Sequence, residues 1–248
     1  ALHEALAIPS LRNEVIRALG ALGDASTPER LVALYGELSA EERQDAVNTL
    51  VVRPAGARVL LDAIAAESIP RTDLHAYQVR QLVGFGDESL TDRVREVWGE
   101  VRNSPADRVE RIEKLRQLAS GPLMETASSG RGRMLFDKTC GACHQLFGTG
   151  GDVGPDITGS NRANLDYVLE NMVDPSAVMG NDYRMTLIET DDGRLVSGLV
   201  KLETDSAVTV RTLNDTVVIA KEEIVARELS ELSMMPEGLL DPLSEQEI

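Results

Sequence analysis

The stretch TCGACHQLFGTGGDVGPDITG (residues 139–159) contains both cysteines of this 248-residue chain. Cys140 and Cys143 are separated by two residues, and His144 follows directly. A glycine-rich segment at 148–154 comes next. Because two thiols and an imidazole are concentrated here, the class of protein depends on what this stretch binds.

A Cys-x-x-Cys pair has several uses in proteins. A structural zinc site usually needs four ligands, but the chain has no third cysteine, and His3 and His75 lie in its other half. A thioredoxin-like redox motif lies between a strand and a helix and needs no histidine, whereas here a predicted helix precedes the motif and a glycine loop follows it. Cys-x-x-Cys-His is instead the attachment signature of c-type haem.

The spacing of the motif suits covalent haem attachment. Each thiol can add to one vinyl group of the porphyrin as a thioether, and two intervening residues let one turn of chain span both vinyls. The next residue, His144, then lies under the iron, where it supplies a neutral imidazole ligand. The sequence therefore predicts one haem c, attached at Cys140 and Cys143.

The segment before the motif is predicted to form a short helix, one side of which faces the haem. Gly132 and Phe136 are one helical turn apart and lie on one face. The glycine allows another helix to approach closely, and the phenylalanine is expected to pack near the macrocycle.

Two segments after the motif supply further candidate residues. Gly154 and Pro155 open GPDITG (154–159), and the Pro155 carbonyl can accept a hydrogen bond from the ring N–H of His144, which would fix the tautomer of the ligand. SMMPEGL (233–239) offers a thioether late in the chain, and His–Met ligation raises the reduction potential and suits electron transfer.

Three stretches, GRMLFDKTCGACH, GPDITG and MMPEGLLDPLSEQEI, together resemble class I cytochrome c. More narrowly, residues 129–248 resemble the haem-binding domain of large multidomain proteins from planctomycetes and verrucomicrobia. VGPDITG, DPSA, DGRLVSGL and MPEGLL occur here in the order that is typical of that family. The resemblance covers about half the chain, and the family is typically joined to helical repeats and to β-propeller dehydrogenase-like domains.

The resemblance implies thioethers at Cys140 and Cys143, with His144 as the proximal iron ligand. It also implies that the methionine before the proline, Met235, is the distal ligand. Other methionines stay open as alternatives to Met235: Met234, Met179 and Met185.

Residues 1–102 are predicted to form helical repeats. Valines and leucines recur at intervals of 31 or 32 residues, at Val15, Val47 and Val79 and at Leu19, Leu50 and Leu82. A fixed period in this range is typical of a solenoid of helix pairs. LGALGD and LVGFGD resemble the second helix of HEAT-type repeats, and the alternative is an irregular helical domain.

The remaining organisation follows from changes of pattern. Residues 103–128 are expected to be a connecting helix and linker, and 129–248 the cytochrome c-like domain. At about 183–228 the hydrophobic period becomes two, which predicts an antiparallel meander of about four strands. The expected fold class is therefore mainly α, with an N-terminal α-solenoid and an α domain that carries a small β insertion.

The C-terminus departs from the cytochrome pattern. Ser244 and Glu247 form a capping box, which marks a helix start, but the sequence stops at Ile248. We expect the C-terminal helix, which in a cytochrome c crosses the Gly132 face, to be missing from this sequence.

Charge and composition exclude some partners. The formal net charge is −16, and such an acidic chain is a poor candidate for binding nucleic acid. No apolar stretch reaches the length of a membrane span. The absence of a signal peptide and of an initiating Met suggests a mature protein or an excised fragment.

These observations predict an electron-transfer module that works with redox partner proteins or a linked dehydrogenase domain. With both axial positions of the iron filled, an electron carrier is expected rather than an enzyme by itself. The alternative is a helical-repeat scaffold with an accessory haem domain. Because bacteria attach haem c outside the cytoplasmic membrane, we expect a periplasmic or otherwise extracytoplasmic location.

Overall fold

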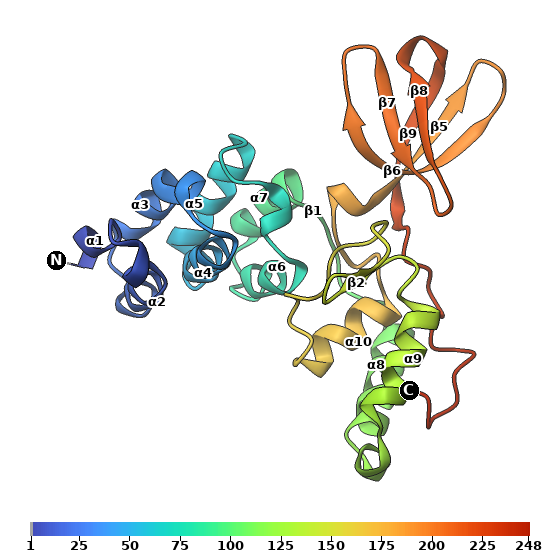
Figure 1. Cartoon of the computed structure of the whole chain (residues 1–248), viewed down its shortest axis with the longest axis horizontal. Helices are drawn as coiled ribbons and strands as arrows, with labels where there is room; N and C mark the ends of the chain where they lie inside the picture. The colour runs from blue at the N-terminus through green and yellow to red at the C-terminus, as the bar shows by residue number, and fades with distance from the viewer. Residues whose placement is uncertain (1) are drawn as a thin grey trace. The chain divides into compact units, whose positions relative to one another are not determined.

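A computed structural model describes residues 2–248, apart from the side chain of Leu123 (Figure 1). The chain divides into two compact units, the first ending at Val101 and the second running from Arg102 to Ile248. No described helix combines the length and the apolar composition that a membrane crossing requires.

The first unit is built from helices, with one short strand at its end. The helices are α1 (Leu2–Ala5), α2 (Arg12–Leu22), α3 (Thr27–Leu34), α4 (Ala40–Leu50), α5 (Pro54–Ala65), α6 (Ala76–Val83) and α7 (Glu88–Val97). Short 3-10 turns lie at Pro9–Leu11, Tyr35–Glu37 and Arg71–Asp73, and the strand is β1 (Gly99–Val101). α2 packs against α4, while α3 and α7 both pack against α5, so successive helix pairs stack in two layers.

The valines and leucines that recur along the sequence occupy equivalent positions in successive helix pairs. The recurring valines and leucines are all buried, each at most 7% exposed: Val15, Val47, Val79, Leu19, Leu50 and Leu82. Polar side chains join neighbouring repeats. Thr49 Oγ1 donates to the Ile16 carbonyl at 3.3 Å, and Gln81 Nε2 donates to the Val51 carbonyl at 3.2 Å. The repeat spacing therefore sets both the apolar core and the hydrogen bonds between repeats.

The second unit begins with a helical part. Its helices are α8 (Ala106–Ala119), α9 (Ser129–Thr139) and α10 (Leu165–Val173), with 3-10 turns at Pro122–Thr126, Asn181–Tyr183 and Lys221–Glu223. Its short strands are β2 (Gln145–Leu146), β3 (Thr149–Gly150) and β4 (Val178–Gly180). α8 packs on α10 through a buried cluster of Ile112, Leu115, Leu169, Val173 and Leu240. The segment 103–128, expected as a connector, thus contributes to the core of this unit.

A five-stranded antiparallel sheet completes the second unit (Figure 1). Its strands are β5 (Arg184–Thr190), β6 (Leu195–Glu203), β7 (Ala207–Arg211), β8 (Thr216–Ala220) and β9 (Ile224–Ser233), in the order β8-β7-β6-β5-β9. One face buries Ile188, Val208, Val210 and Ile219. β9 does not lie beside the preceding strand, β8, but pairs with β5 on the side opposite β6.

The mainly α fold class expected from the sequence is wrong. Helices make up about 48% of the chain and strands about 19%, so the fold is a mixture of helices and sheet. The sheet also has five strands rather than about four, and it extends to Ser233. The extra length lies in β9, whose side chains are mostly exposed, so apolar alternation is weak there and pairing with the distant β5 decides the strand.

Candidate haem-binding site

The Cys-x-x-Cys-His motif forms one compact turn at the C-terminal end of α9. The N–H of Cys140 donates to the Phe136 carbonyl at 2.7 Å and thereby continues the helical hydrogen bonds. The N–H groups of Cys143 and His144 both donate to the Cys140 carbonyl, at 3.0 and 2.9 Å. This turn brings the two thiols and the imidazole together by local backbone hydrogen bonding alone.

Both thiols are free and half-buried. Burial raises the pKa of the Cys140 thiol above its usual range, and the adjacent Cys143 adds to the rise. Cys140 caps the C-terminal end of α9, where the helix dipole disfavours a thiolate. Redox-active Cys-x-x-Cys motifs are placed instead where the thiol pKa is lowered, such as at helix N-termini. The position of this motif is therefore unlike that of a thiol–disulfide oxidoreductase.

The glycine-rich loop wraps closely around the motif. The N–H of Gly151 donates to the Gly141 carbonyl at 2.9 Å, and the N–H of Gly154 donates to the Cys143 carbonyl at 2.8 Å. A Cβ at Gly151 would lie only 2.0 Å from the Ala142 oxygen, and a Cβ at Gly154 would lie 2.5 Å from His144 Cε1. Glycine is required at both positions, because a side chain at Gly151 would meet the backbone of Ala142 and a side chain at Gly154 would meet the His144 ring.

The His144 ring is oriented by Pro155. Nδ1 of the ring lies 2.9 Å from the Pro155 carbonyl oxygen, which can only accept a hydrogen bond. Nδ1 therefore carries the proton, and the lone pair of Nε2 is left for a metal. A histidine ligand with its second nitrogen bonded to a backbone carbonyl is the usual arrangement at metal and haem iron.

The helix before the motif lacks a core of its own. α9 buries none of its residues, Leu135 and Phe136 are half-buried, and Met134 is 66% exposed. Apart from the neighbouring residues and the backbone of α9 itself, no described atom lies within 4 Å of a Cβ built on Gly132, so this face of α9 is open. The buried clusters of the second unit, around α8 and α10 and inside the sheet, contain no residue of 129–164.

These features fit a haem. The site offers two free thiols, one oriented imidazole and half-buried apolar side chains around them. A large, flat, apolar group attached at this turn would supply the buried surface that α9 lacks.

Met235 lies in the loop after β9. Its N–H donates to Ser233 Oγ at 3.1 Å, and the N–H of Ser233 donates to Ser176 Oγ at 3.0 Å. Met234 and Met235 are both half-buried, whereas Met179 is only 4% exposed. Among the described residues, no hydrogen bond joins Met235 to the Cys-x-x-Cys-His motif.

The DPSA segment, 174–177, combines a hydrogen bond to that loop with an ion pair that sequence reasoning missed. The Asp174 side chain is 1% exposed and receives two hydrogen bonds from Arg102, at 2.9 and 2.7 Å. Ser176, two residues later, holds the backbone at Ser233. The motif was visible in the sequence, but its partners were not, because Arg102 is 72 residues away.

The sheet contacts the glycine loop through Asp152, a second residue that sequence reasoning missed. Arg211 Nη2 donates to Asp152 Oδ1 at 3.2 Å, and Lys201 Nζ donates to the Asp152 carbonyl at 3.3 Å. The neighbouring Val153 is only 3% exposed. The β strands therefore brace the loop that wraps the motif.

The other histidines take no part in this site. His3 and His75 belong to the first unit, where His3 contacts Thr27 and His75 contacts Gln44. Within residues 2–248 no three His, Cys, Asp or Glu side chains gather in a way that could hold a metal ion.

No family model matches this chain, and comparison with curated proteins found no match.

Proposed function

We propose that the second unit is a c-type cytochrome domain that transfers electrons and binds one haem c covalently at Cys140 and Cys143. The observation that carries the proposal is the hydrogen bond to Pro155 that orients His144, in a turn that also holds two free thiols. This arrangement leaves one imidazole nitrogen available beside two attachment points.

Each residue of the site has a distinct role in this proposal. Cys140 and Cys143 anchor the group, and His144 binds the iron through Nε2. Pro155 keeps the imidazole in one tautomer and one orientation, and Gly154 leaves room for the ring. When bound, the haem supplies a one-electron ferric/ferrous couple.

Met235 is proposed as the distal ligand, with Met234 as the alternative. The Ser176–Ser233 hydrogen bond fixes the start of this loop, which supports a ligand held at a defined position. A methionine in the sixth position leaves no open site for a substrate, which favours an electron carrier over an enzyme.

The partners proposed are redox proteins or a linked dehydrogenase domain, in a periplasmic or otherwise extracytoplasmic compartment. The net charge of −16 favours association with a basic surface on such a partner.

A helical scaffold with an accessory haem domain is the second candidate. The stacked helix pairs of the first unit favour it, because repeats of this kind present extended surfaces for binding proteins.

The test is an absorption spectrum of the full chain made in a bacterial host that matures haem c. Oxidised and dithionite-reduced samples are recorded before and after acid–acetone extraction. We expect haem that survives extraction and sharp reduced bands. Replacing both cysteines by Ala should release the haem on extraction, whereas His75→Ala in the other unit should not. A colourless wild-type chain would contradict the cytochrome proposal and leave the scaffold as the better account.

A further inference from the structure

The loop that carries Met235 returns from the sheet to α8. Leu240, five residues after Met235, is 7% exposed and packs in a cluster with Ile112 and Leu115 of α8. The end of the loop is therefore anchored on a helix that lies outside the Cys-x-x-Cys-His motif.

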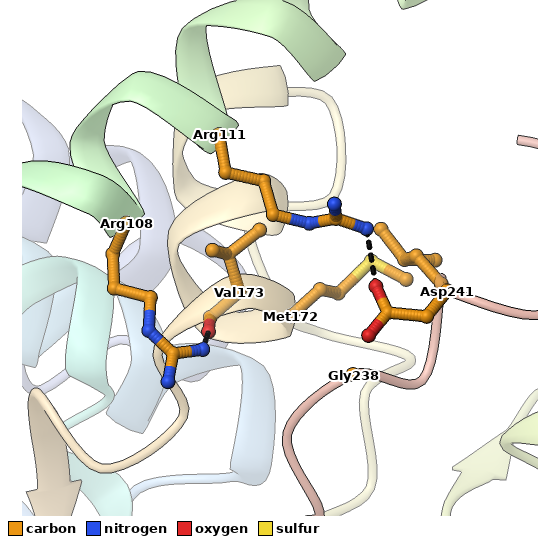
Figure 2. Close-up of a pocket in the computed structure, with 7 residues that line it drawn as sticks. Arg108, Arg111, Met172, Val173, Gly238 and Asp241 are labelled. Carbon is orange, nitrogen blue, oxygen red and sulfur yellow. Dashed lines mark hydrogen bonds and ion pairs between the residues drawn. The ribbon is translucent and has the colours of Figure 1, made fainter.

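Two arginines of α8 form ion pairs with carboxylates of this loop. Arg108 Nη2 donates to Glu237, and Arg111 Nη2 donates to Asp241. The arginines are three residues apart and thus lie on one face of the helix. Figure 2 shows Arg108 and Arg111 extending from α8, with Arg111 reaching Asp241 in the turn that contains Gly238.

Gly238 shapes the turn that presents the carboxylates. Its φ is +75°, in the left-handed region that favours glycine, and its carbonyl accepts the N–H of Asp241 at 2.9 Å. A Cβ at Gly238 would lie 2.8 Å from Asp241 Oδ2. This tight turn brings Glu237 and Asp241 to the two arginines of α8.

Packing beneath the turn is incomplete. A cavity of about 100 Å³ lies between the turn, α8 and α10. Its lining consists of Arg108, Arg111, Met172, Val173, Gly238, Leu240 and Asp241 (Figure 2). The arginines of both ion pairs line this cavity, so the ion pairs close one side of it.

Met235 is therefore held on both sides. On the N-terminal side Ser233 is bonded to Ser176 at 3.0 Å, and on the C-terminal side Glu237 is paired with Arg108. Only residues 234–236 lie between these two anchors. Such outer contacts are what fix a ligand side chain in space.

We propose that Arg108 and Arg111 are positioning residues that hold the Met235 loop against α8 and thereby keep the methionine available to the iron. This inference rests on the proposed cytochrome function. Arg108 and Glu237 are 30% and 42% exposed, and Arg111 and Asp241 are 45% and 62% exposed. Added salt therefore reaches both pairs and weakens the hold on the loop.

The test compares the full-length wild type with an Arg108→Gln/Arg111→Gln variant and with Arg116→Gln. Arg116 is the matched control, since it lies on the same helix but pairs with Asp166 and Glu113 instead of the loop. Amide hydrogen exchange is measured across residues 234–241. We expect exchange about tenfold faster in the double variant and unchanged in the control.

Imidazole titration of the haem-loaded proteins gives a second readout, because imidazole competes with the methionine for the iron. We expect the midpoint concentration to fall about tenfold in the double variant, and salt to lower it in the wild type more than in the double variant. The charge-exchanged Arg108→Glu/Glu237→Arg variant is expected to recover most of the wild-type midpoint.

The outcomes separate the two proposals. A wild type that holds covalent haem, with exchange and imidazole midpoints in the double variant equal to those of Arg116→Gln, overturns the positioning role alone. A wild type without covalent haem overturns the cytochrome function and this inference with it. Faster exchange and a lower midpoint confined to the double variant support both.

Discussion

His144 Nδ1 lies 2.9 Å from the carbonyl oxygen of Pro155, eleven residues along the chain. The loop can bring the Pro155 carbonyl this close to His144 because Gly154 has no side chain and its backbone packs directly against the imidazole ring. The bond aligns the proposed proximal ligand before any haem is bound, and the first prediction follows from it.

Gly154→Ala should displace the His144 ring, because the new Cβ would lie 2.5 Å from Cε1. We expect a loss of about 2 kcal/mol in the free energy of unfolding and a lower yield of low-spin haem protein. The control is Gly159→Ala, since nothing described lies within 4 Å of a Cβ at that position. Urea unfolding and the absorption spectrum measure the two effects, and equal behaviour of the two variants would contradict the packing argument.

Met235→Ala should remove the distal ligand. We expect the low-spin spectrum of the reduced protein to be lost and the reduction potential to fall by on the order of 0.1 V. Met234→Ala is the matched control, because it removes the same side chain from the adjacent position. If Met234→Ala causes the change and Met235→Ala does not, the ligand is Met234.

Asp174→Ala should destabilise the second unit. The carboxylate is 1% exposed and makes a two-pronged pair with Arg102, whose own side chain is 39% exposed. Partial exposure of Arg102 reduces the penalty of leaving it unpaired, so we expect a loss of about 2–3 kcal/mol. Asp166→Ala removes an exposed carboxylate paired with Arg116 and should cost less than about 1 kcal/mol. Chemical denaturation followed by circular dichroism distinguishes the two.

The stability of the first unit should fall in mild acid because of His75. Burial lowers the pKa of His75 in the folded state, an effect only partly offset by Asp73, so the unfolded chain takes up a proton more readily. The contribution is present in full above the unfolded pKa of about 6.5 and is lost as the pH falls through the lower folded pKa.

The single tryptophan, Trp98, reports on this change, since its indole donates to the Leu74 carbonyl at 2.7 Å beside His75. Urea unfolding followed by Trp98 fluorescence should show a midpoint that drops between pH 7.5 and pH 5. His75→Gln should flatten this dependence. An identical pH dependence in the wild type and His75→Gln would rule out this role.

Local sequence determined much of the candidate site. The Cys-x-x-Cys-His turn, the close passage of Gly154 and the His144–Pro155 bond all join residues within a few turns of chain. Backbone hydrogen bonding and the small size of glycine suffice to arrange them, so pattern and spacing could anticipate them. The valines and leucines that recur about every 32 residues could also be picked out from the sequence, and all of them are buried.

Tertiary structure alone decided the rest. The sequence did not assign α8 to the second unit, because Arg108 pairs with Glu237, which lies 129 residues further along the chain. The sequence analysis ended the strand region too early at β9, because the exposed side chains of β9 show little apolar alternation. The strand is stabilised instead by its pairing with β5. Contacts of this kind depend on which distant segments the fold brings together, and no periodicity within either segment encodes the partner.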